Sequence, residues 1–336
     1  MRKTEQIESA PNAQELDTIR GFSRGHVVAV MQALFVTMLW SSSWVIIKFG
    51  LSELTPLFYS GMRYSVASVI LLAYVLSRTD LRNSVSGLRK SQVRRLVLYG
   101  IVFIAVTQGA QFVALSLLDS ITTSMMLNLT PFVVLFLGVF LLKEVPTWKQ
   151  VALIFLGLLG VIIYFQPVNL PTAALIGLAV VIIEVLANAL SSIMGRSLNR
   201  DRTMPAVVVT VVSMTVGAAI LLCTAAFAEG LAPLSMTSVF FILWLGIVNT
   251  ALAFPIWNHA MRTLRAIDMT LINSTMLPQI TLLAVFILGD RPEPLDWLGL
   301  ALVGLSALFV QLSQARHAGL QEQKSVEERL PSGEIR

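Results

Sequence analysis

The sequence is short of the residues that most catalytic and metal-binding sites require. Its 336 residues include one cysteine, Cys223, which lies inside an apolar run, and this excludes a disulfide framework or a redox motif. The three histidines are isolated: His26 and His317 lie in the polar ends of the chain, and His259 lies near the end of an apolar segment. We therefore expect no metal, no cofactor and no enzyme activity, because no nucleophile has a base at usable spacing.

Charged residues are also scarce. Only 13% of the residues are charged and 56% are hydrophobic, whereas a soluble domain carries about 25% charged residues. The net charge of +5 comes from basic loops, where it suits anionic lipid headgroups, so we expect no nucleic-acid partner. The composition is typical of an all-α integral membrane protein that crosses the bilayer repeatedly.

Ten apolar segments are long enough to cross a bilayer as helices, which requires roughly 17 to 25 residues. Residues 1–27 show no cleavage pattern and are expected to form a cytoplasmic tail, and residues 314–336 are expected to be a disordered cytoplasmic tail. The predicted spans are 28–49, 56–77, 96–117, 121–142, 150–166, 172–195, 205–228, 237–261, 267–288 and 295–313.

The basic residues set the orientation of these spans. Of the 24 Lys and Arg residues, Lys48 and Arg63 lie within spans and Arg291 lies in a loop on one side; the other 21 lie in the tails and in the loops on the opposite side. Short loops rich in Lys and Arg stay in the cytoplasm during insertion. The distribution predicts ten spans with both termini cytoplasmic, in the cell (inner or plasma) membrane.

Two stretches of the sequence, 128–161 and 275–308, resemble each other. Each has a proline within an apolar helix, then an acidic turn and a helix with small residues, and Pro131 aligns with Pro278 at an offset of 147. Each half holds five spans, an odd number, so the second half enters the membrane in the opposite orientation. The sequence therefore predicts two inverted repeats, 28–166 and 172–313, an architecture common among secondary transporters.

Three features together resemble the EamA-type members of the drug/metabolite transporter superfamily. They are LWSSSW at 39–44, TPLFYSGMRYSVASVILL at 55–72, and the two proline-to-acid stretches. The resemblance implies ten helices in two inverted units, a central cavity lined mainly by spans 1, 3, 4, 6, 8 and 9, peripheral spans 5 and 10, and alternating access. One departure is that the second repeat has DRPEP where the first has KEVP.

Pro131 and Pro278 are candidate hinges. Each lacks an amide hydrogen and leaves the carbonyl group four residues earlier, at Leu127 or Ser274, without its helical partner. In a membrane such groups must be satisfied by neighbouring protein or by a water-filled cavity, so the two helices are expected to line the substrate path. A simple packing kink is the alternative.

Among single residues, Glu184 is the strongest candidate for a role in transport. It lies about 18 Å into span 6 at about 1.5 Å per residue, where a carboxylate is costly, and Asn188 shares its face. We expect it to bind a substrate ammonium group or to exchange a proton; the alternative is a structural group that pairs with Arg63. Arg63 is itself a candidate charge site that captures a substrate carboxylate or forms a structural bond.

The other candidates are aromatic and amide side chains within spans, which either line the cavity or bond neighbouring helices. Lys48 is expected to extend to the outer headgroups. Small residues on spans 5 and 10 favour close packing, including a homodimer through these peripheral spans. The remaining substrate-binding candidates are Trp40, Trp44, Gln108, Gln111, Asn128, Asn249, Trp257 and Asn273.

These features favour a secondary transporter that exports a small amphipathic metabolite, such as an amino acid or a related compound. Aromatic, amide and acidic groups suit a zwitterion with an apolar side. The alternative is an uptake carrier for a sugar- or nucleotide-linked metabolite, which would need more basic residues inside the spans. No glycine-rich phosphate loop is present, so we expect no ATP hydrolysis.

Overall fold

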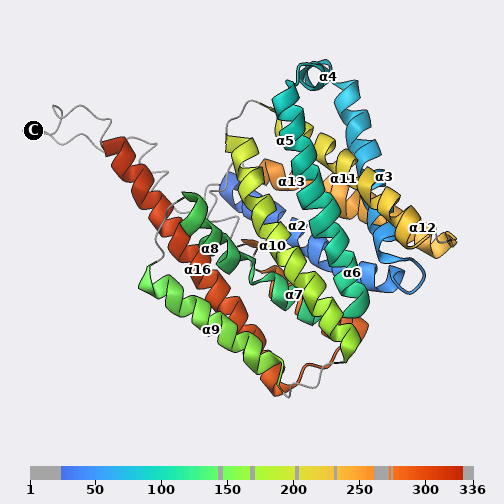
Figure 1. Ribbon diagram of the computed structural model, residues 1–336. Helices are drawn as coiled ribbons and strands as arrows, with labels where there is room; N and C mark the ends of the chain where they lie inside the picture. Colours follow the sequence, from blue (N-terminus) through green and yellow to red (C-terminus); the bar gives the residue numbers. More distant parts are fainter. Residues whose placement is uncertain are drawn as a thin grey trace, which may run out of the picture.

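The chain folds into a bundle of helices. The computed structural model describes residues 24–142, 147–166, 171–200, 204–230, 233–260, 272–273 and 275–327, and these ranges contain helices, turns and loops but no strand. Figure 1 shows most helices packed side by side, with α9 and α16 forming a pair along one side of the bundle.

Seven helical stretches are long and apolar enough to cross a membrane, and three shorter apolar helices accompany them within the described ranges. Apolar side chains cover the outside of the bundle, including Phe227 (93% exposed) and Phe286 (81% exposed). Only a lipid environment makes such a surface favourable, so the chain is an integral membrane protein. The long stretches are Val27–Gly50, Pro56–Ser77, Lys90–Leu117, Ser120–Leu137, Thr172–Gly195, Ala206–Ala228 and Met236–Trp257, and the shorter helices are Trp148–Tyr164, Met276–Leu288 and Pro294–Val310.

The helices follow the predicted spans in order, and several spans are divided into two or three elements. Span 2 and helix α3 have the same bounds, Pro56–Ser77. The elements are α2 (Arg24–Gly50), α3 (Pro56–Ser77), α4 (Thr79–Ser86), α5 (Lys90–Gly100), η1 (Ile101–Gln108), α6 (Gly109–Leu117), α7 (Ser120–Leu127), α8 (Thr130–Leu142), α9 (Trp148–Tyr164), α10 (Thr172–Arg200), α11 (Ala206–Ala228), α12 (Met236–Gly246), η2 (Ile247–Leu252), α13 (Ala253–Ala260), α15 (Met276–Leu283), η3 (Ala284–Leu288) and α16 (Pro294–Glu327).

Helix α16 continues to Glu327, past residue 313 where the predicted tenth span ends. Residues 314–327 include several Ala, Gln and Glu residues, which favour helix, and a helix that has already formed extends at little cost. The prediction of a disordered tail is therefore wrong for this stretch. The predicted amino tail up to residue 23, and residues 328–336, lie outside the described residues.

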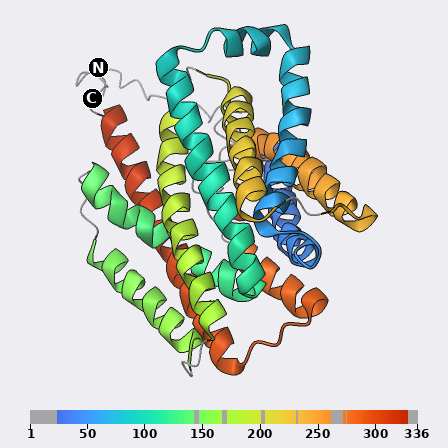
Figure 2. The same cartoon turned by 45° about the vertical axis from the view of Figure 1, so that its right-hand side comes forward.

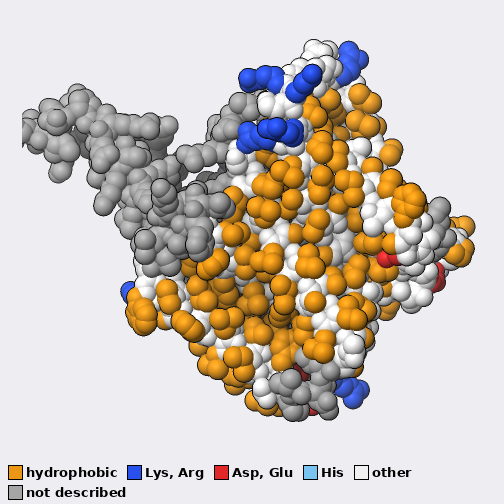
Figure 3. Space-filling view, in the orientation of Figure 1, with side chains coloured by type: hydrophobic (Ala, Val, Ile, Leu, Met, Phe, Trp, Pro, Cys, Tyr) orange, Lys and Arg blue, Asp and Glu red, His pale blue; other side chains and the backbone are white. Residues whose placement is uncertain are grey.

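Loops predicted on the same side of the membrane meet in the structure. At one end, Nη2 of Arg95 donates to Ser197 Oγ at 3.0 Å, which joins the 78–95 and 196–204 regions. At the other end, Oγ of Ser235 and Ser238 donate to Glu53 Oε2, which joins the loop after α2 to the start of α12. Figure 2 shows α4 alone across one end of the bundle, and Figure 3 shows Lys and Arg side chains gathered at that end.

The helix contacts repeat when each span is exchanged for the span five places away. Three contacts join equivalent spans directly: α3 with α11 (spans 2 and 7), α7 with α15 (4 and 9) and α9 with α16 (5 and 10). Other contacts occur as matched pairs of spans. Helix α2 (span 1) packs on α12, η2 and α13 (span 8), and α10 (span 6) packs on η1 and α6 (span 3). Likewise, α2 packs on α15 (span 9), and α10 packs on α7 and α8 (span 4). The contacts within and between the two halves therefore follow one pattern.

Glycine residues allow the closest of these approaches. A Cβ on Gly246, which ends α12, would lie 2.7 Å from a methyl carbon of Val66 on α3. A Cβ on Gly100, which ends α5, would collide with the carbonyl oxygen of Ser213 on α11. Each of these glycines directly precedes a π-helical segment, so spans 3 and 8 share the same construction.

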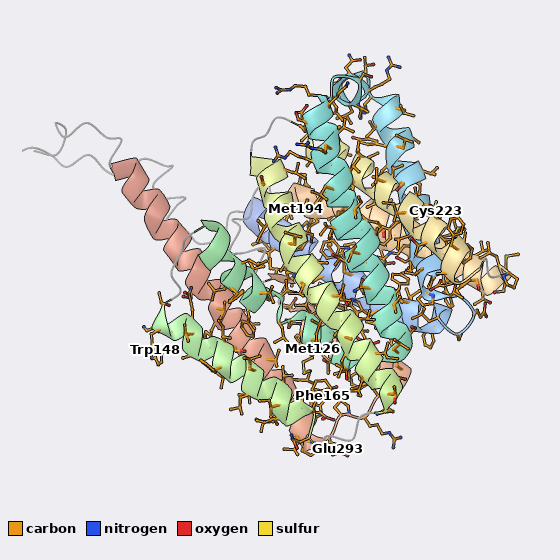
Figure 4. The ribbon with its side chains drawn as sticks, viewed as in Figure 1. Met126, Trp148, Phe165, Met194, Cys223 and Glu293 are labelled. Carbon is orange, nitrogen blue, oxygen red and sulfur yellow. The ribbon has the colours of Figure 1, made fainter. Side chains whose placement is uncertain are left out.

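Helices α9 and α16 also approach closely through glycine. A Cβ on Gly160 would lie 2.9 Å from the carbonyl oxygen of Gly299, and a Cβ on Gly299 would lie 2.7 Å from the carbonyl oxygen of Gly160. The small residues that the sequence associates with a homodimer therefore make contacts within one chain. Trp148, at the start of α9, is 81% exposed and projects from the bundle in Figure 4.

Candidate functional site

Three consecutive residues of the LWSSSW motif contact three different elements of the second half. The ring of Trp40 lies 4.9 Å from the ring of Trp257 and 5.7 Å from that of Phe254, both on α13. Ser41 Oγ donates to Gln279 Oε1 of α15 at 2.9 Å, and Ser42 Oγ accepts from Asn249 Nδ2 of η2 at 3.3 Å. This segment of α2 is therefore the junction of the two halves.

The carboxamide of Gln279 is fully used at this junction. Its Nε2 donates to Thr37 Oγ1 at 3.2 Å and to Thr275 Oγ1 at 2.9 Å. Both threonine hydroxyls donate their own hydrogen to backbone carbonyls, so they are available as acceptors. The directions of all these bonds agree, so the network ties α15 to α2.

Asn249 is only partly satisfied. Its side chain is fully buried, and its Nδ2 donates to the carbonyl of Leu39 and to Ser42 Oγ. Its Oδ1 has no hydrogen-bond partner among the residues described. A buried amide oxygen without a donor is unfavourable, so this position can accept a hydrogen bond from a solute or from water.

A second polar group lies between α3, η1, η2 and α10. Arg63 is buried, with 5% of its surface exposed, and its Nε donates to Thr250 Oγ1 at 3.1 Å. Its guanidinium carbon lies 5.3 Å from the ring centre of Tyr64 and 6.0 Å from that of Phe112. The hydroxyl of Tyr64 donates to Gln108 Oε1 at 2.6 Å.

Glu184 completes this second group from α10. Only 1% of its surface is exposed, and its Oε2 has no hydrogen-bond partner within the described part of the chain. Helix α10, which carries Glu184, packs against η1, the element that carries Gln108. The described residues contain no ion pair between Glu184 and Arg63, so the structure does not support the alternative in which they neutralise each other directly.

The fourth apolar stretch is interrupted just before Pro131. Helix α7 ends at Leu127 and α8 begins at Thr130, and the Thr130 hydroxyl donates to the carbonyl of Leu127 at 2.7 Å. This satisfies the carbonyl group that the proline leaves without a partner. The same hydroxyl accepts from Asn188 Nδ2 at 3.3 Å, so the break is tied to α10. Asn128 Nδ2 donates to the carbonyl of Ser124.

Other candidates lie apart from these groups. Trp44 is buried in an apolar cluster with Phe58, Tyr59 and Phe112, and Gln111 is buried but forms no hydrogen bond with the described residues. Pro278 and Asn273 are exposed, and Ser274, whose carbonyl Pro278 leaves free, lies outside the described residues. The expectation that Pro131 and Pro278 line the path symmetrically therefore remains a prediction.

The ammonium group of Lys48, expected to extend to the outer headgroups, forms a hydrogen bond within the protein as well. Its Nζ donates to the carbonyl of Leu118 at 2.6 Å, one residue before Asp119 in the chain. The bond joins the end of α2 to the end of α6.

Four residues take part in these groups although the sequence gave little reason to choose them as site residues. Tyr64, Thr130 and Thr250 are common residue types inside membrane helices, and only their partners mark them. Gln279 follows Pro278 and is noticeable only as a polar neighbour of that proline.

The chemistry available at these groups is that of binding. The described residues include no cluster of metal-ligating side chains. The polar groups are neutral apart from one guanidinium and one carboxyl group, both buried. A separate surface groove of about 370 Å³ lies at the start of α2 and is mostly apolar; it is lined by Val27, Val28, Met31, Gln32, Phe35 and Ile256.

Helices with apolar outer surfaces bury polar side chains at the places where they meet. This arrangement is typical of a membrane protein that transports small solutes. The chain matches the model of the EamA-like transporter family over residues 27–166 and 175–312, one match for each half, and it belongs to this family. It is therefore a transporter of the drug/metabolite type and not an enzyme.

Individual relatives are more distant. The chain is 29% identical over 138 residues to the "S-adenosylmethionine/S-adenosylhomocysteine transporter" of Chlamydia trachomatis, a match that spans 41% of each chain. It is 23% identical over 294 residues to the "Probable amino-acid metabolite efflux pump" of Escherichia coli, which covers 83% of this chain and 93% of that one. A crystal structure that is 20% identical, with a TM-score of 0.58, covers 86% of this chain and shares its fold.

Proposed function

We propose that this protein is a secondary transporter of the cell membrane that exports a small amphipathic metabolite, an amino acid or a related compound, by alternating access. In this proposal ten spans form two inverted halves, and both termini are cytoplasmic. The solute crosses between the halves. The energy comes from a gradient of the solute or of protons.

The helix contacts support two equivalent halves. Contacts that map onto one another when spans are exchanged five places apart are expected for two copies of one fold, and two copies of five spans each must have opposite orientations. The π-helical segments after Gly100 and Gly246 add the same construction to spans 3 and 8. The three shorter apolar helices supply the spans beyond the seven longer ones.

The junction of the halves at LWSSSW is the observation that carries the proposal. Polar groups are expensive between helices in a membrane and are kept where they bond or where solute passes. Here they join the two halves through α2, which is where motion between halves would open a path. Trp40, Asn249 and Trp257 are proposed to line this path, with Gln108, Asn128, Glu184 and Asn188 facing it from the other elements.

The names of the relatives agree with a cargo that carries an α-amino-acid group. The Chlamydia trachomatis protein is named for S-adenosylmethionine and S-adenosylhomocysteine, and the Escherichia coli protein for amino-acid metabolites. S-adenosylmethionine and S-adenosylhomocysteine each have an ammonium and a carboxylate group on one carbon. We propose the same chemical class for this chain.

Flux into proteoliposomes tests the proposal. The purified protein is reconstituted and assayed with a panel of labelled amino acids, S-adenosylmethionine and a neutral sugar, with and without a pH gradient. We expect saturable flux of at least one amino-acid compound and none of the sugar. Liposomes that carry a protein denatured before reconstitution give the leak rate. Absence of protein-dependent flux for every solute would contradict the proposal.

A further inference from the structure

A carboxylate at the end of α11 caps the beginning of α3. Glu229, the residue that follows α11, accepts hydrogen bonds from the backbone amides of Leu57, at 3.0 and 3.2 Å, and Phe58, at 3.2 Å. Helix α3 has no cap of its own among the described residues, because the Thr55 side chain makes no capping hydrogen bond and Pro56 has no amide hydrogen. The first amides of a helix lack partners within it and form its positive end, so a carboxylate suits this place. Charge-assisted bonds therefore join spans 2 and 7 at this end.

The reciprocal connection comes from Glu53, in the loop between α2 and α3. Its Oε2 accepts from the hydroxyl of Ser235 and, at 2.6 Å, from that of Ser238, and both serines lie at the start of α12. The loop before α3 thus carries the acid that bonds α12, and the loop before α12 carries the acid that caps α3. We call these two carboxylates and the groups that they bind the clasp. Separating the two loops would break both sets of bonds at once.

Packing next to the clasp is close and apolar. A Cβ on Gly61 would lie 2.8 Å from the side chain of Leu222 and 3.1 Å from its backbone nitrogen, so α3 and α11 approach backbone to backbone. One apolar cluster contains buried residues that lie within about a turn of the clasp residues in the chain. Opening this end between the two loops would expose the cluster to water, which is unfavourable. The buried residues concerned are Leu54, Phe58, Ala225 and Ile242.

We propose that the clasp keeps the ends of spans 1, 2, 7 and 8 closed throughout the transport cycle, and that this end of the bundle opens between α2 and the turn from α6 to α7. The proposal rests on the function proposed above, in whose orientation this end faces outward. The contact at that turn is of a different kind. Among the described residues it consists of one side-chain hydrogen bond, from Lys48 to the carbonyl of Leu118, beside the exposed Asp119. A single hydrogen bond adds little net stability, so it can break and reform in each cycle.

Reversible cross-linking of the full-length protein in proteoliposomes tests this division. Cys223 is replaced by serine, and two cysteine pairs are compared: Glu53→Cys with Ser235→Cys across the clasp, and Lys48→Cys with Asp119→Cys across the other contact. A short bis-methanethiosulfonate joins each pair, and flux of labelled L-amino acids and S-adenosylmethionine is measured before cross-linking, after it and after reduction. Cross-linking the clasp pair should change flux by less than about twofold, and cross-linking the other pair should lower it about tenfold or more until the link is reduced.

Amide hydrogen exchange in nanodiscs provides a readout that does not depend on any solute. Glu229→Gln should speed exchange of the Leu57 and Phe58 amides about tenfold or more, and should also speed that of the Ser238 amide, because the clasp opens as one unit. Asp296→Asn is the matched control. The Asp296 carboxylate accepts from the Glu293 amide at 2.7 Å at the start of α16, so this variant should leave the clasp amides unchanged.

Three outcomes would overturn the inference. A reversible loss of flux on cross-linking the clasp pair would show that the two loops must separate during transport. Unchanged flux after cross-linking the pair at Lys48 and Asp119 would show that this end opens elsewhere. Faster exchange at Leu57 and Phe58 alone, with Ser238 unaffected, would show that the two carboxylates act independently. If no solute is transported, the proposed function fails, and the exchange rates still decide whether the clasp is one unit.

Discussion

The hydroxyl groups of Thr107 and Thr250 make the same hydrogen bond in the two halves of the chain. Each donates, at 2.8 Å, to the carbonyl oxygen five residues earlier, Val102 for Thr107 and Leu245 for Thr250. Both residues are buried in π-helical segments, where the wider turn brings that carbonyl within reach. Such segments are rare and occur often at functional sites. Here each segment supplies one residue of the second polar group, Gln108 from η1 and Thr250 from η2.

The two threonines differ in one respect that a matched pair of variants can measure. Thr250 also accepts a hydrogen bond from Arg63, whereas Thr107 has no such partner among the described residues. Valine at either position removes the bond to the carbonyl, but only Thr250→Val strands the guanidinium Nε. We expect Thr250→Val to lower the free energy of unfolding by about 1.5–3 kcal/mol more than Thr107→Val, measured by denaturant unfolding in detergent. Equal losses would show that Arg63 does not depend on this bond.

The helix break at Pro131 provides a second test. The Thr130 hydroxyl satisfies the carbonyl of Leu127 and accepts from Asn188, so Thr130→Val should cost about 1–3 kcal/mol. Thr224→Val is the control, because the Thr224 hydroxyl bonds the carbonyl of Ile220 on the exposed face of a regular helix. The shift in thermal unfolding midpoint should be clear for Thr130→Val and small for Thr224→Val. A comparable shift in both variants would indicate that another group donates a hydrogen bond to the carbonyl of Leu127.

Glycine contacts between α9 and α16 give a third prediction. A Cβ at Gly160 would lie 2.8 Å from the Cβ of Leu302 and 2.9 Å from a backbone oxygen, neither of which can move freely, so Gly160→Ala should cost about 1–3 kcal/mol. Among the described residues outside its own turn of helix, a Cβ at Gly304 would meet only the end of the Leu277 side chain, at 3.2 Å. Gly304→Ala should therefore be much milder in the same thermal unfolding assay. The prediction fails if the two alanine variants have the same thermal unfolding midpoint.

Glu53 should make one loop contact sensitive to acid. Hydrogen bonds from Ser235 and Ser238 hold the pKa of the Glu53 carboxyl below its ordinary value of 4.5. For an acid whose folded pKa is depressed, the stabilisation is present above the unfolded pKa and is lost as pH falls through the folded value. Protection of the Ser238 amide against hydrogen exchange should therefore fall as the pH drops below about 4.5. Glu53→Gln should remove that dependence; an unchanged profile in the variant would refute the assignment.

Asp290 should show the opposite sign. Burial, and then the negative charge of Asp119, raise the pKa of the Asp290 carboxyl, and Lys48 opposes them. The folded state therefore holds this proton more firmly, and the ionised side chain lowers stability as pH rises through the ordinary range of the group and above it. We expect Asp290→Asn to raise the thermal midpoint at pH 8 and to have a smaller effect near pH 4. A gain of equal size at both pH values would show that charge is not the cause.

The positions of the seven long apolar helices were predictable because apolar length is a local property of the sequence. The bounds of α3 coincide with those of the predicted span, and the break before Pro131 follows from the missing amide hydrogen. The π-helical segments were not predictable, because they depend on how closely spans 3 and 8 pack against α11 and α3 rather than on their own residues.

The candidate site was predictable only in part. Glu184 and Arg63 are evident as charges in apolar surroundings, and the motif around Trp40 is evident as a polar interruption. The sequence does not predict that these residues fall into two separate polar groups. Trp44, for example, lies one turn from Trp40 and yet packs into an apolar cluster. Tyr64 could not be chosen in advance, since its importance comes from residues that are distant in the sequence.

Helix α16 has 34 residues, so at about 1.5 Å per residue it is about 51 Å long. The hydrocarbon layer of a bilayer is only about 30 Å thick. One end of this helix must therefore stand clear of the lipid as a rod several turns long. A fluorescent or affinity label joined near Glu327 would be held in water at a distance from the bundle, where it would report the length of this rod and leave the loops at that end uncovered.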